Sequence, residues 1–252
     1  MKKLFFVLIF IKCLFSSSIE YYLYSIDMNY KEYDTNGAYL DGDYSDLGDL
    51  NGIGIKLYSN NLNYRYYLKG EFAYGSSTYV GYTWGGDYLV LYKNDVYMIN
   101  LQSALFPGRK NYYLGLGARI WNRGKSDYPG DYNEIYYWPY VTLGYYNVFN
   151  LNLFYLSTEF AYQYAFLPKL KADFGSGTTL SLGTTTGYKV EIKTYFKYSS
   201  NLIFNLMYRY QMWHINRSDP AIVTYNNKQV IVIEPESYTK NQYIGAGLIY
   251  KF

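Results

Sequence analysis

Strict alternation of apolar and polar residues is the feature that most constrains the fold of this chain. Residues 188–198 and 201–213 show it most clearly, with aromatic and aliphatic side chains at nearly every even position. A period of two residues is that of a β-strand whose two faces differ. A soluble sandwich also alternates, but it rarely places charges at four of five successive positions of one face, as occurs between residues 189 and 197. The pattern therefore predicts a strand with one face toward lipid and one toward a wet or ion-paired lumen.

The same alternation recurs along the chain. Further segments are residues 21–32, 51–59, 63–74, 95–105, 111–121, 136–146 and 152–166. Each has about the length, 10 to 14 residues, that a tilted membrane strand requires. Hydrophobic residues make up 50% of the chain and charged residues only 17%, yet no apolar run beyond the first 20 residues is long enough for a transmembrane helix. With a formal charge of only +3, the chain is not expected to bind nucleic acid.

The last segment ends in an aromatic residue on its apolar face. Phe252, Tyr250 and Leu248 share that face, while Lys251 and Gly247 lie on the other. A terminal Phe that closes an amphipathic strand resembles the signal by which the assembly machinery of the bacterial outer membrane selects barrels. We therefore expect Phe252, Tyr250 and Leu248 to act as a membrane-assembly signal, with the barrel-assembly machinery as a partner.

The segments between the predicted strands alternate between short and long. The short ones are residues 59–62, 106–110, 147–151 and 199–201, and the long ones are residues 34–49, 75–94, 122–134, 167–187 and 214–240. Outer-membrane barrels have short periplasmic turns and longer external loops. The pattern thus predicts an all-β fold, a single closed antiparallel transmembrane β-barrel of ten strands. Residues 75–94 fit either strand extensions or a further hairpin, so eight or twelve strands stay possible.

The N-terminal residues 1–18 have the pattern of a secretory signal peptide. A short basic stretch precedes an apolar stretch that only Lys12 interrupts, and small serines follow it. We expect cleavage near Ser18, so that residues 19–252 form the barrel and the mature chain lacks the single cysteine, Cys13. Export of such a barrel places it in the outer membrane of a Gram-negative bacterium, in contact with membrane lipid and lipopolysaccharide.

The chain contains 38 tyrosines, an excess that calls for a physical cause. Amphipathic rings prefer the level of the lipid headgroups, and barrels carry aromatic girdles at both interfaces. The residues that we place at such edges are Trp84, Trp121, Tyr136, Tyr137, Trp138, Tyr140 and Trp213. The tyrosines are accordingly expected at the membrane interfaces and on the lipid-facing side of the strands.

Three segments resemble strands of the omptins, the ten-stranded proteases of the outer membrane. They are Asn111-Tyr-Tyr-Leu-Gly-Leu-Gly-Ala, Trp138-Pro-Tyr-Val-Thr-Leu-Gly-Tyr and Asn241-Gln-Tyr-Ile-Gly-Ala-Gly-Leu-Ile-Tyr-Lys-Phe. The likeness covers the second half of the chain best. It implies a ten-stranded barrel and, in the omptins themselves, catalytic groups on the external loops.

Omptin catalysis uses an Asp-x-His pair on the fourth external loop and an acidic pair on the second. This chain departs from that pattern, because its fourth loop has Asp173 but no His, and Asp87 and Asp95 in the second loop are eight residues apart. The only histidine, His214, begins the fifth loop near Asp219. A general base must lie within hydrogen-bond reach of its proton. His214, Asp219 and Asp173 are therefore only weak catalytic candidates, and we expect no enzymatic activity.

The first long loop is rich in aspartate, and Asp41-Gly-Asp-Tyr-Ser-Asp begins like a calcium-binding loop. Such a loop needs Gly at position six and Glu at position twelve, where this chain has Asp46 and Gly52. We therefore expect a solvated acidic loop here, and the same for the acidic residues of segment 122–134. Neither a metal nor a cofactor is expected.

On the predicted inward face, cations outnumber acids. By parity the lumen-lining residues are Arg65, Lys69, Glu71, Arg119, Glu159, Lys189, Glu191, Lys193 and Arg209, with Asp27, Lys31, Lys56, Lys197 and Lys251 also pointing inward. Ten strands enclose a narrow tube that side chains can fill. The favoured function is therefore that of a plugged, monomeric, non-enzymatic barrel that acts as a structural or surface-interaction protein through its external loops. The alternatives are a narrow anion-favouring pore that uses the lumenal Lys and Arg side chains, and an omptin-like surface protease.

Overall fold

The structure is a computed structural model, and it describes residues 17–60, 64–82, 86–108 and 110–252. Residues 1–16, which carry most of the predicted signal peptide, lie outside the described residues, as does Trp84. In the part of the chain that is described, no helix is long and apolar enough to cross a membrane.

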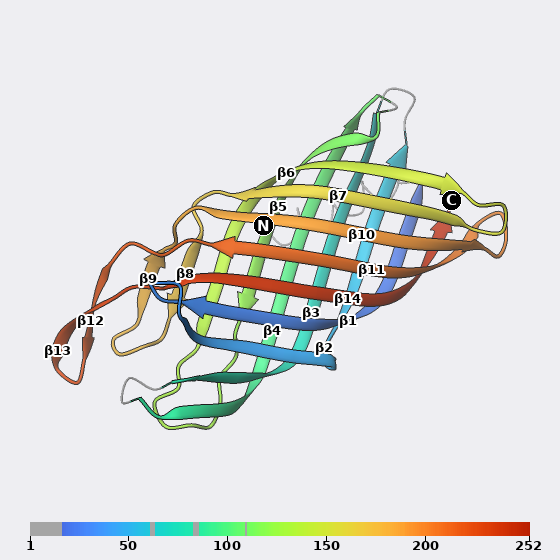
Figure 1. Cartoon of the computed structure of the whole chain (residues 1–252). Helices are drawn as coiled ribbons and strands as arrows, with labels where there is room; N and C mark the ends of the chain where they lie inside the picture. The colour runs from blue at the N-terminus through green and yellow to red at the C-terminus, as the bar shows by residue number, and fades with distance from the viewer. Residues whose placement is uncertain (1–16, 61–63, 83–85, 109) are drawn as a thin grey trace, which may run out of the picture.

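Ten long antiparallel strands form the wall of one closed barrel (Figure 1). They are β1 (Ser18–Tyr33), β2 (Tyr39–Asn60), β3 (Tyr64–Tyr82), β4 (Tyr88–Pro107), β5 (Tyr112–Asn122), β6 (Glu134–Asn150), β7 (Tyr155–Ala165), β10 (Thr185–Lys197), β11 (Leu202–Ile215) and β14 (Glu236–Lys251). Each strand pairs with the next one in this order, and β14 pairs along its whole length with β1, which closes the sheet. The predicted all-β, ten-stranded closed barrel is confirmed, and the counts of eight and twelve are wrong.

The two ends of the barrel differ in their connections. At one end, which we call the turn end, short turns join the strands, and the C-terminus lies there (Figure 1). At the opposite end, the loop end, two connections carry hairpins of their own. These hairpins are β8 (Lys169–Ala172) with β9 (Thr178–Ser181), and β12 (Ala221–Tyr225) with β13 (Lys228–Val232). Strand β8 also pairs with the start of β6, which anchors the first hairpin to the barrel wall.

Strands β2, β3 and β4 are longer than the sequence predicts. Residues 75–82 extend β3 and residues 88–94 extend β4 beyond a register shift, and these described residues add no further pair of barrel strands. The long loop predicted over residues 34–49 is wrong, because a turn over residues 34–38 suffices to connect β1 and β2. Within this turn the Asp34 carboxylate accepts hydrogen bonds from two backbone amides. Strand β2 then begins at Tyr39, so the acidic residues that follow belong to the barrel wall.

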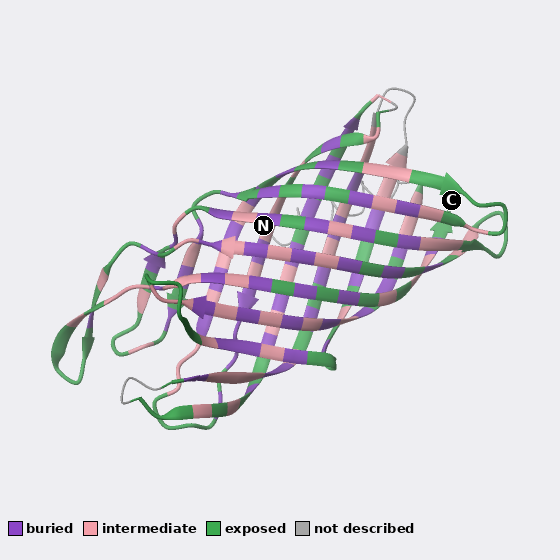
Figure 2. Ribbon diagram, viewed as in Figure 1, coloured by how far each residue is buried: buried purple, intermediate pink, exposed green. Residues whose placement is uncertain are grey.

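Apolar side chains form a band around the outside of the barrel, where exposed and buried residues alternate along each strand (Figure 2). Leu23 on β1, Leu114 on β5 and Leu206 on β11 are 67%, 65% and 56% exposed. Beyond Leu23, the outward-facing residues of β1 are polar up to Lys31. We take the membrane-spanning segments to end with this band, so that the strands continue past them at the loop end.

The prediction of which side chains of β1 point into the lumen is wrong. Asp27 and Lys31 lie on the outer side of the wall, and Glu20 and Glu32 point inward, where they are 0% and 5% exposed. On the outer surface, Asp27 accepts a hydrogen bond from Gln242 Nε2 at 3.3 Å. Tyrosines occur on both faces of this strand, so the alternation alone did not distinguish its two sides.

Several aromatic residues that the sequence places in interface girdles instead fill the lumen. Trp121, Trp138 and Trp213 are 0%, 1% and 0% exposed, and Tyr136 and Tyr140 are equally buried. The Trp138 and Trp213 rings pack edge to face at 5.1 Å, and the Trp121 and Tyr136 rings stack at 5.0 Å. The girdle prediction is wrong for these five residues, because the direction of a strand side chain follows its parity and not its depth in the membrane.

Candidate functional site

Ion pairs cross the middle of the lumen. Arg209 on β11 places Nη2 2.7 Å from Glu71 Oε1 on β3, and its Nε lies 2.6 Å from Glu191 Oε2 on β10. Lys193 Nζ lies 2.6 Å from Glu20 Oε1 on β1. In the barrel wall β3 and β11 are separated by β2, β1 and β14, so the pair of Arg209 with Glu71 spans the interior. These side chains fill the lumen and connect opposite walls.

The predicted lumen-lining residues lie inside the barrel in two different settings. Those that are at most 6% exposed are Lys69, Glu71, Arg119, Glu159, Lys189, Glu191, Lys193 and Arg209. Arg65 is only half-buried at the turn end, where its Nη2 donates to the Lys110 carbonyl at 2.6 Å. Arg119 forms no ion pair with any described residue, and its Nη2 contacts Met98 Sδ at 3.4 Å. The middle of the lumen, away from the loop end, therefore contains a cation that no described carboxylate neutralises.

Tyr30 links the aromatic layer to a second polar cluster at the loop end. Its ring packs edge-on against Trp121 at 5.0 Å, and its hydroxyl lies 2.9 Å from the hydroxyl of Tyr136. The same hydroxyl donates a hydrogen bond to Glu32 Oε1 at 2.7 Å. The apolar layer thus ends where a group of carboxylates begins.

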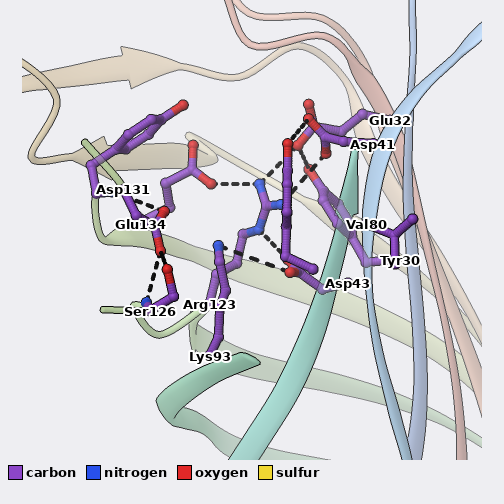
Figure 3. Close-up of polar contacts among 12 residues, drawn as sticks. Tyr30, Glu32, Asp41, Asp43, Val80, Lys93, Arg123, Ser126, Asp131 and Glu134 are labelled. Carbon is purple, nitrogen blue, oxygen red and sulfur yellow. Dashed lines mark hydrogen bonds and ion pairs between the residues drawn. The ribbon is translucent and has the colours of Figure 1, made fainter. Parts of the chain in front are cut away.

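Arg123 lies at the centre of this group and is 3% exposed (Figure 3). Its Nη1 lies 2.8 Å from Glu32 Oε1 and 2.5 Å from Glu134 Oε2. Its Nε donates to Asp43 Oδ2 at 2.5 Å, and its Nη2 lies 3.6 Å from Asp41 Oδ1. One guanidinium therefore faces four carboxylates from β1, β2 and β6.

Two further charged residues complete the cluster. Lys93 on β4 places Nζ 3.9 Å from Asp43 Oδ1. Glu234, in the connection between β13 and β14, accepts hydrogen bonds from the hydroxyls of Tyr30 and Tyr136. We call this set the loop-end acidic cluster, and its members are the carboxyls of Glu32, Asp41, Asp43, Glu134 and Glu234 with the cations Arg123 and Lys93.

Burial and crowding raise the pKa values of several of these carboxyls. Burial raises the pKa of Glu32 to about 7 and that of Asp41 to about 6, and in both cases nearby carboxylates add to the rise while Arg123 opposes it. Burial also raises the pKa of Glu134 and, with help from the Glu32 and Glu134 charges, raises that of Glu234 well above its usual value. A further cation at this place would favour the ionised forms and release protons.

Apart from the fully buried Asp43, the members of the loop-end acidic cluster line a cavity of about 480 Å³, and Asp131 adds a further carboxyl to its wall. The other walls of this cavity are largely apolar and come from the loop hairpins, with Leu170 on β8, Leu180 on β9 and Val232 on β13. Tyr79 and Tyr82 line it from the extension of β3. The barrel wall thus supplies charge to the cavity, and the hairpins supply an apolar rim.

The prediction of solvated acidic loops is wrong for residues that belong to this cluster. Asp43 is 0% exposed and Glu134 is 5% exposed, because both are neutralised by Arg123. Asp41 and Asp43 are two residues apart, which places both on the same face of a strand. This spacing was the sequence signal that could have predicted a strand here. Nothing in the sequence singled out Arg123, whose partners lie up to 91 residues away. Among the described residues, no group of three or more His, Cys, Asp or Glu side chains is arranged to hold a metal ion.

The weak catalytic candidates are not brought together. His214 faces the outside of the barrel at the loop end, with Nε2 2.7 Å from Glu236 Oε1 and the ring of Tyr238 stacked on it at 4.4 Å. Asp173 accepts a hydrogen bond from a backbone amide, and Asp219 is exposed. Within the described part of the chain, neither aspartate contacts His214.

The end of β14 lies on the outer surface at the turn end. Phe252 and Tyr250 are 69% and 45% exposed, and their rings meet edge to face at 5.4 Å. Leu248 lies on the same outward face and is partly exposed. The backbone amide of Phe252 donates to the Ser17 carbonyl at 3.2 Å, so the last residue still pairs with the first strand.

These features define a closed barrel of the outer-membrane type. The sequence matches no protein-family model and no curated protein. Among solved structures, the barrel is similar to the outer membrane protease OmpT from Escherichia coli, with a TM-score of 0.57 and 13% identity over 93% of this chain and 96% of that chain. Looser matches are Neisserial surface protein A (TM-score 0.36, 10% identity, 92% of this chain and 97% of that chain) and the beta domain of the Bordetella autotransporter BrkA (0.44, 13%, 94% and 100%). The likeness to OmpT shows that the chain has the omptin-like barrel fold.

Proposed function

We propose that this chain is an integral outer-membrane barrel of a Gram-negative bacterium that binds a positively charged ligand in its loop-end cavity, without enzymatic activity. The loop end faces the outside of the cell and the turn end faces the periplasm, as is usual for barrels with this arrangement of connections. The proposal rests on one observation, the excess of carboxyls over cations around a cavity at that end.

The chemistry of the cavity favours a ligand that combines a cationic group with an apolar part. Two cations, Arg123 and Lys93, line the cavity beside the carboxyls of Glu32, Asp41, Asp131, Glu134 and Glu234, so an ammonium or guanidinium group would find carboxyl acceptors there. The leucine and valine side chains of the hairpins fit an aliphatic stem. A lysine-like or arginine-like side chain of a peptide has both properties.

A conducting pore is a weaker interpretation. The ion pairs of Arg209 and Lys193 and the buried layer of Trp121, Trp138 and Trp213 fill the interior between the two ends. The surplus of lumenal cations would favour anions if the lumen opened. We expect planar bilayers with the purified protein to show no steady conductance, and a stable open channel would contradict a lumen filled by side chains.

A protease of the omptin kind is also a weaker interpretation. His214 faces away from the loop-end acidic cluster and is held by Glu236 and Tyr238. A general base must reach both the attacking water and a group that orients it, and the described acids inside the barrel do not contact His214. Peptide cleavage that is lost in His214→Ala would contradict the non-enzymatic assignment.

The binding proposal is tested with fluorescently labelled tri-lysine and tri-glutamate peptides and the full chain in neutral detergent. We expect tri-lysine to bind and tri-glutamate not to bind. The variant Asp41→Asn/Glu134→Gln removes two carboxylates from the cavity and should weaken tri-lysine binding by about tenfold, which corresponds to 1.4 kcal/mol. Asp127→Asn removes an exposed acid elsewhere on the loop end and is the matched control. Equal affinity of the two variants would refute the site.

Contact with lipid and lipopolysaccharide, recognition by the barrel-assembly machinery and a monomeric state belong to the same proposal. The outward band with Leu23 and Leu206 supports the first, and the outward Phe252 and Tyr250 support the second. Deletion of Phe252 should lower the amount of folded barrel in the outer membrane, as measured by the shift in gel mobility between heated and unheated samples. An unchanged yield would remove Phe252 as an assembly signal.

A further inference from the structure

The turn end of the lumen opens into a second cavity, which we call the turn-end vestibule. Its volume is about 810 Å³, and its lining comes from β1, β2, β3, β4, β6, β7, β10, β11 and β14. It is therefore the mouth of the barrel and not a groove between neighbouring strands. Its size falls within the range of small-molecule sites, roughly 300 to 1,000 Å³.

The charge of the vestibule is of one sign. Lys56, Arg65, Lys197 and Lys251 line it, and none of the described residues in its lining is Asp or Glu. Lys197 and Lys251 are exposed at the rim, whereas Lys56 lies deeper and is only 5% exposed. The charge of the vestibule is thus opposite to that of the loop-end cavity, in which acids predominate.

Lys56 is a buried cation with aromatic rings, and no described carboxylate, in close contact with its ammonium group. Its Nζ lies 4.0 Å from the centre of the Tyr67 ring and 4.7 Å from that of Tyr58, and it forms no ion pair with any described carboxylate. The two acids deeper in the lumen on this side are already paired, Glu20 with Lys193 and Glu159 with Lys189, each at 2.6 Å. Aromatic faces stabilise a cation only in part, so an anion beside Lys56 would compensate the rest of its charge.

Arg65 adds a second free donor group to the lining. Its guanidinium lies over the Phe106 ring at 4.9 Å, and one of its nitrogens donates to the Lys110 carbonyl. Its buried Nε has no hydrogen-bond partner within the described protein. A guanidinium placed over an aromatic ring keeps its N–H groups available to a phosphate or carboxylate.

The remaining walls are aromatic. Tyr58, Tyr67, Tyr146 and Tyr195 line the vestibule. Such walls pack against a flat ring, and their hydroxyls can hydrogen-bond to a sugar or an acid group. A bare inorganic anion would use the cations but leave these surfaces uncovered.

We propose that the turn-end vestibule binds a small organic anion that carries phosphate or carboxylate groups on a ring-shaped body. Lys56 binds the acid group from below, Arg65 from the side, and Lys197 and Lys251 attract the ligand at the rim. The site is independent of the cationic ligand proposed for the loop end, because the packed interior separates the two cavities. It lies on the periplasmic side if the loop end faces outward.

The test is calorimetric titration of the full chain in a maltoside detergent with three probes. Adenosine monophosphate is a dianion with a ring, inorganic phosphate has the charge without the ring, and adenosine has the ring without the charge. We expect adenosine monophosphate to bind at least about tenfold more tightly than either of the other probes, a difference of 1.4 kcal/mol. The absence of saturable adenosine monophosphate binding would overturn the proposal, and so would equal binding of all three.

Variants locate the binding to the vestibule. Lys56→Gln should weaken binding of adenosine monophosphate by at least about tenfold, and Lys228→Gln, which removes a lysine from β13 at the loop end, should leave it unchanged. Because Lys56 is buried, the exposed pair Lys197→Gln/Lys251→Gln provides a variant with little risk to folding and should weaken binding to a lesser extent. Wild-type affinity in both variants would overturn the site.

A lipid headgroup carries the same phosphate chemistry as a soluble ligand. The titration is therefore repeated in nanodiscs of phosphatidylcholine with and without phosphatidylglycerol. Equal affinity for adenosine monophosphate in the two kinds of nanodisc supports a soluble ligand. Loss of binding when phosphatidylglycerol is present would assign the vestibule to a headgroup and overturn the proposed soluble anion.

Discussion

The ring of Tyr22 on β1 lies directly over Gly54 on β2, so that a Cβ atom added to Gly54 would lie 2.1 Å from Tyr22 Cζ. The two residues are cross-strand partners, and the ring is held in this position by a hydrogen bond of 2.6 Å from its hydroxyl to Glu71 Oε1. The same arrangement recurs in the cross-strand pairs Tyr24 with Gly52, Tyr140 with Gly117 and Tyr113 with Gly144. Many tyrosines thus lie flat against the inner wall and fill the lumen.

Gly54→Ala should therefore destabilise the barrel by about 1–3 kcal/mol, the usual cost of forcing an extra methyl group into a packed interior. The new Cβ displaces the Tyr22 ring and breaks its hydrogen bond to Glu71. Gly70→Ala is the matched control, because a Cβ at Gly70 on β3 meets nothing closer than 3.5 Å. Urea unfolding of the two variants in the same detergent measures the difference, and equal midpoints would show that the ring is free to move.

Arg209 offers a test of the ion pairs that cross the lumen. Arg209→Met leaves Glu71 and Glu191 buried without their principal partner, which should cost about 3–5 kcal/mol. Arg209→Met/Glu71→Gln should cost less than the sum of the two single variants, because the interaction between Arg209 and Glu71 is lost once in the double variant but is counted twice in the sum. Unfolding free energies of the four proteins give the coupling. Additive costs would mean that the two side chains do not interact across the barrel.

The sequence predicts the barrel well and the loop-end cluster poorly, and the reasons are physical. Alternation of residues such as those around Arg209 reports which face of a strand each side chain occupies where one face is polar, and this suffices to predict the strands. On β1, where tyrosines occur on both faces, it did not give the correct faces. The cluster around Arg123 depends on contacts between residues up to 91 positions apart, and no local pattern encodes these. The lumenal tryptophans such as Trp138 were mispredicted for a different reason. An interface girdle and a packed interior both require aromatic residues near strand ends, so their presence there does not distinguish the two.

The depth of the apolar band leads to a further prediction. Leu206→Arg places a charge on the lipid-facing side of β11, where it should cost about 2–4 kcal/mol if the residue lies near the midplane. Leu47→Arg makes the same change on the loop-end part of β2, where Leu47 is 51% exposed beyond the band. A surface change outside the membrane should stay within about 0.5 kcal/mol. Folding yields and unfolding free energies in lipid vesicles provide the measurement. Similar losses of stability in both variants would mean that the apolar band does not end where we place it.

The raised pKa values of the loop-end acidic cluster predict that stability falls as the pH rises. Burial raises the pKa of Asp41 to about 6 and that of Glu32 to about 7. A carboxyl whose pKa is higher in the folded state than in the unfolded state binds more protons when folded, so its contribution is complete below about pH 4 and is lost as the pH passes through 6 to 7. Thermal unfolding in detergent should therefore occur at a lower temperature at pH 8 than at pH 5.

The variant Asp41→Asn isolates this effect from the other titrating groups of the chain. It removes one of the crowded carboxylates, and the Asp41 charge also contributes to the raised pKa of Glu32. We therefore expect the difference in unfolding temperature between pH 5 and pH 8 to be smaller in Asp41→Asn than in the wild type. The control Asp127→Asn, on the exposed connection between β5 and β6, should keep the full difference. An unchanged pH dependence in Asp41→Asn would mean that the cluster is ionised throughout this range and that its carboxyls are not crowded.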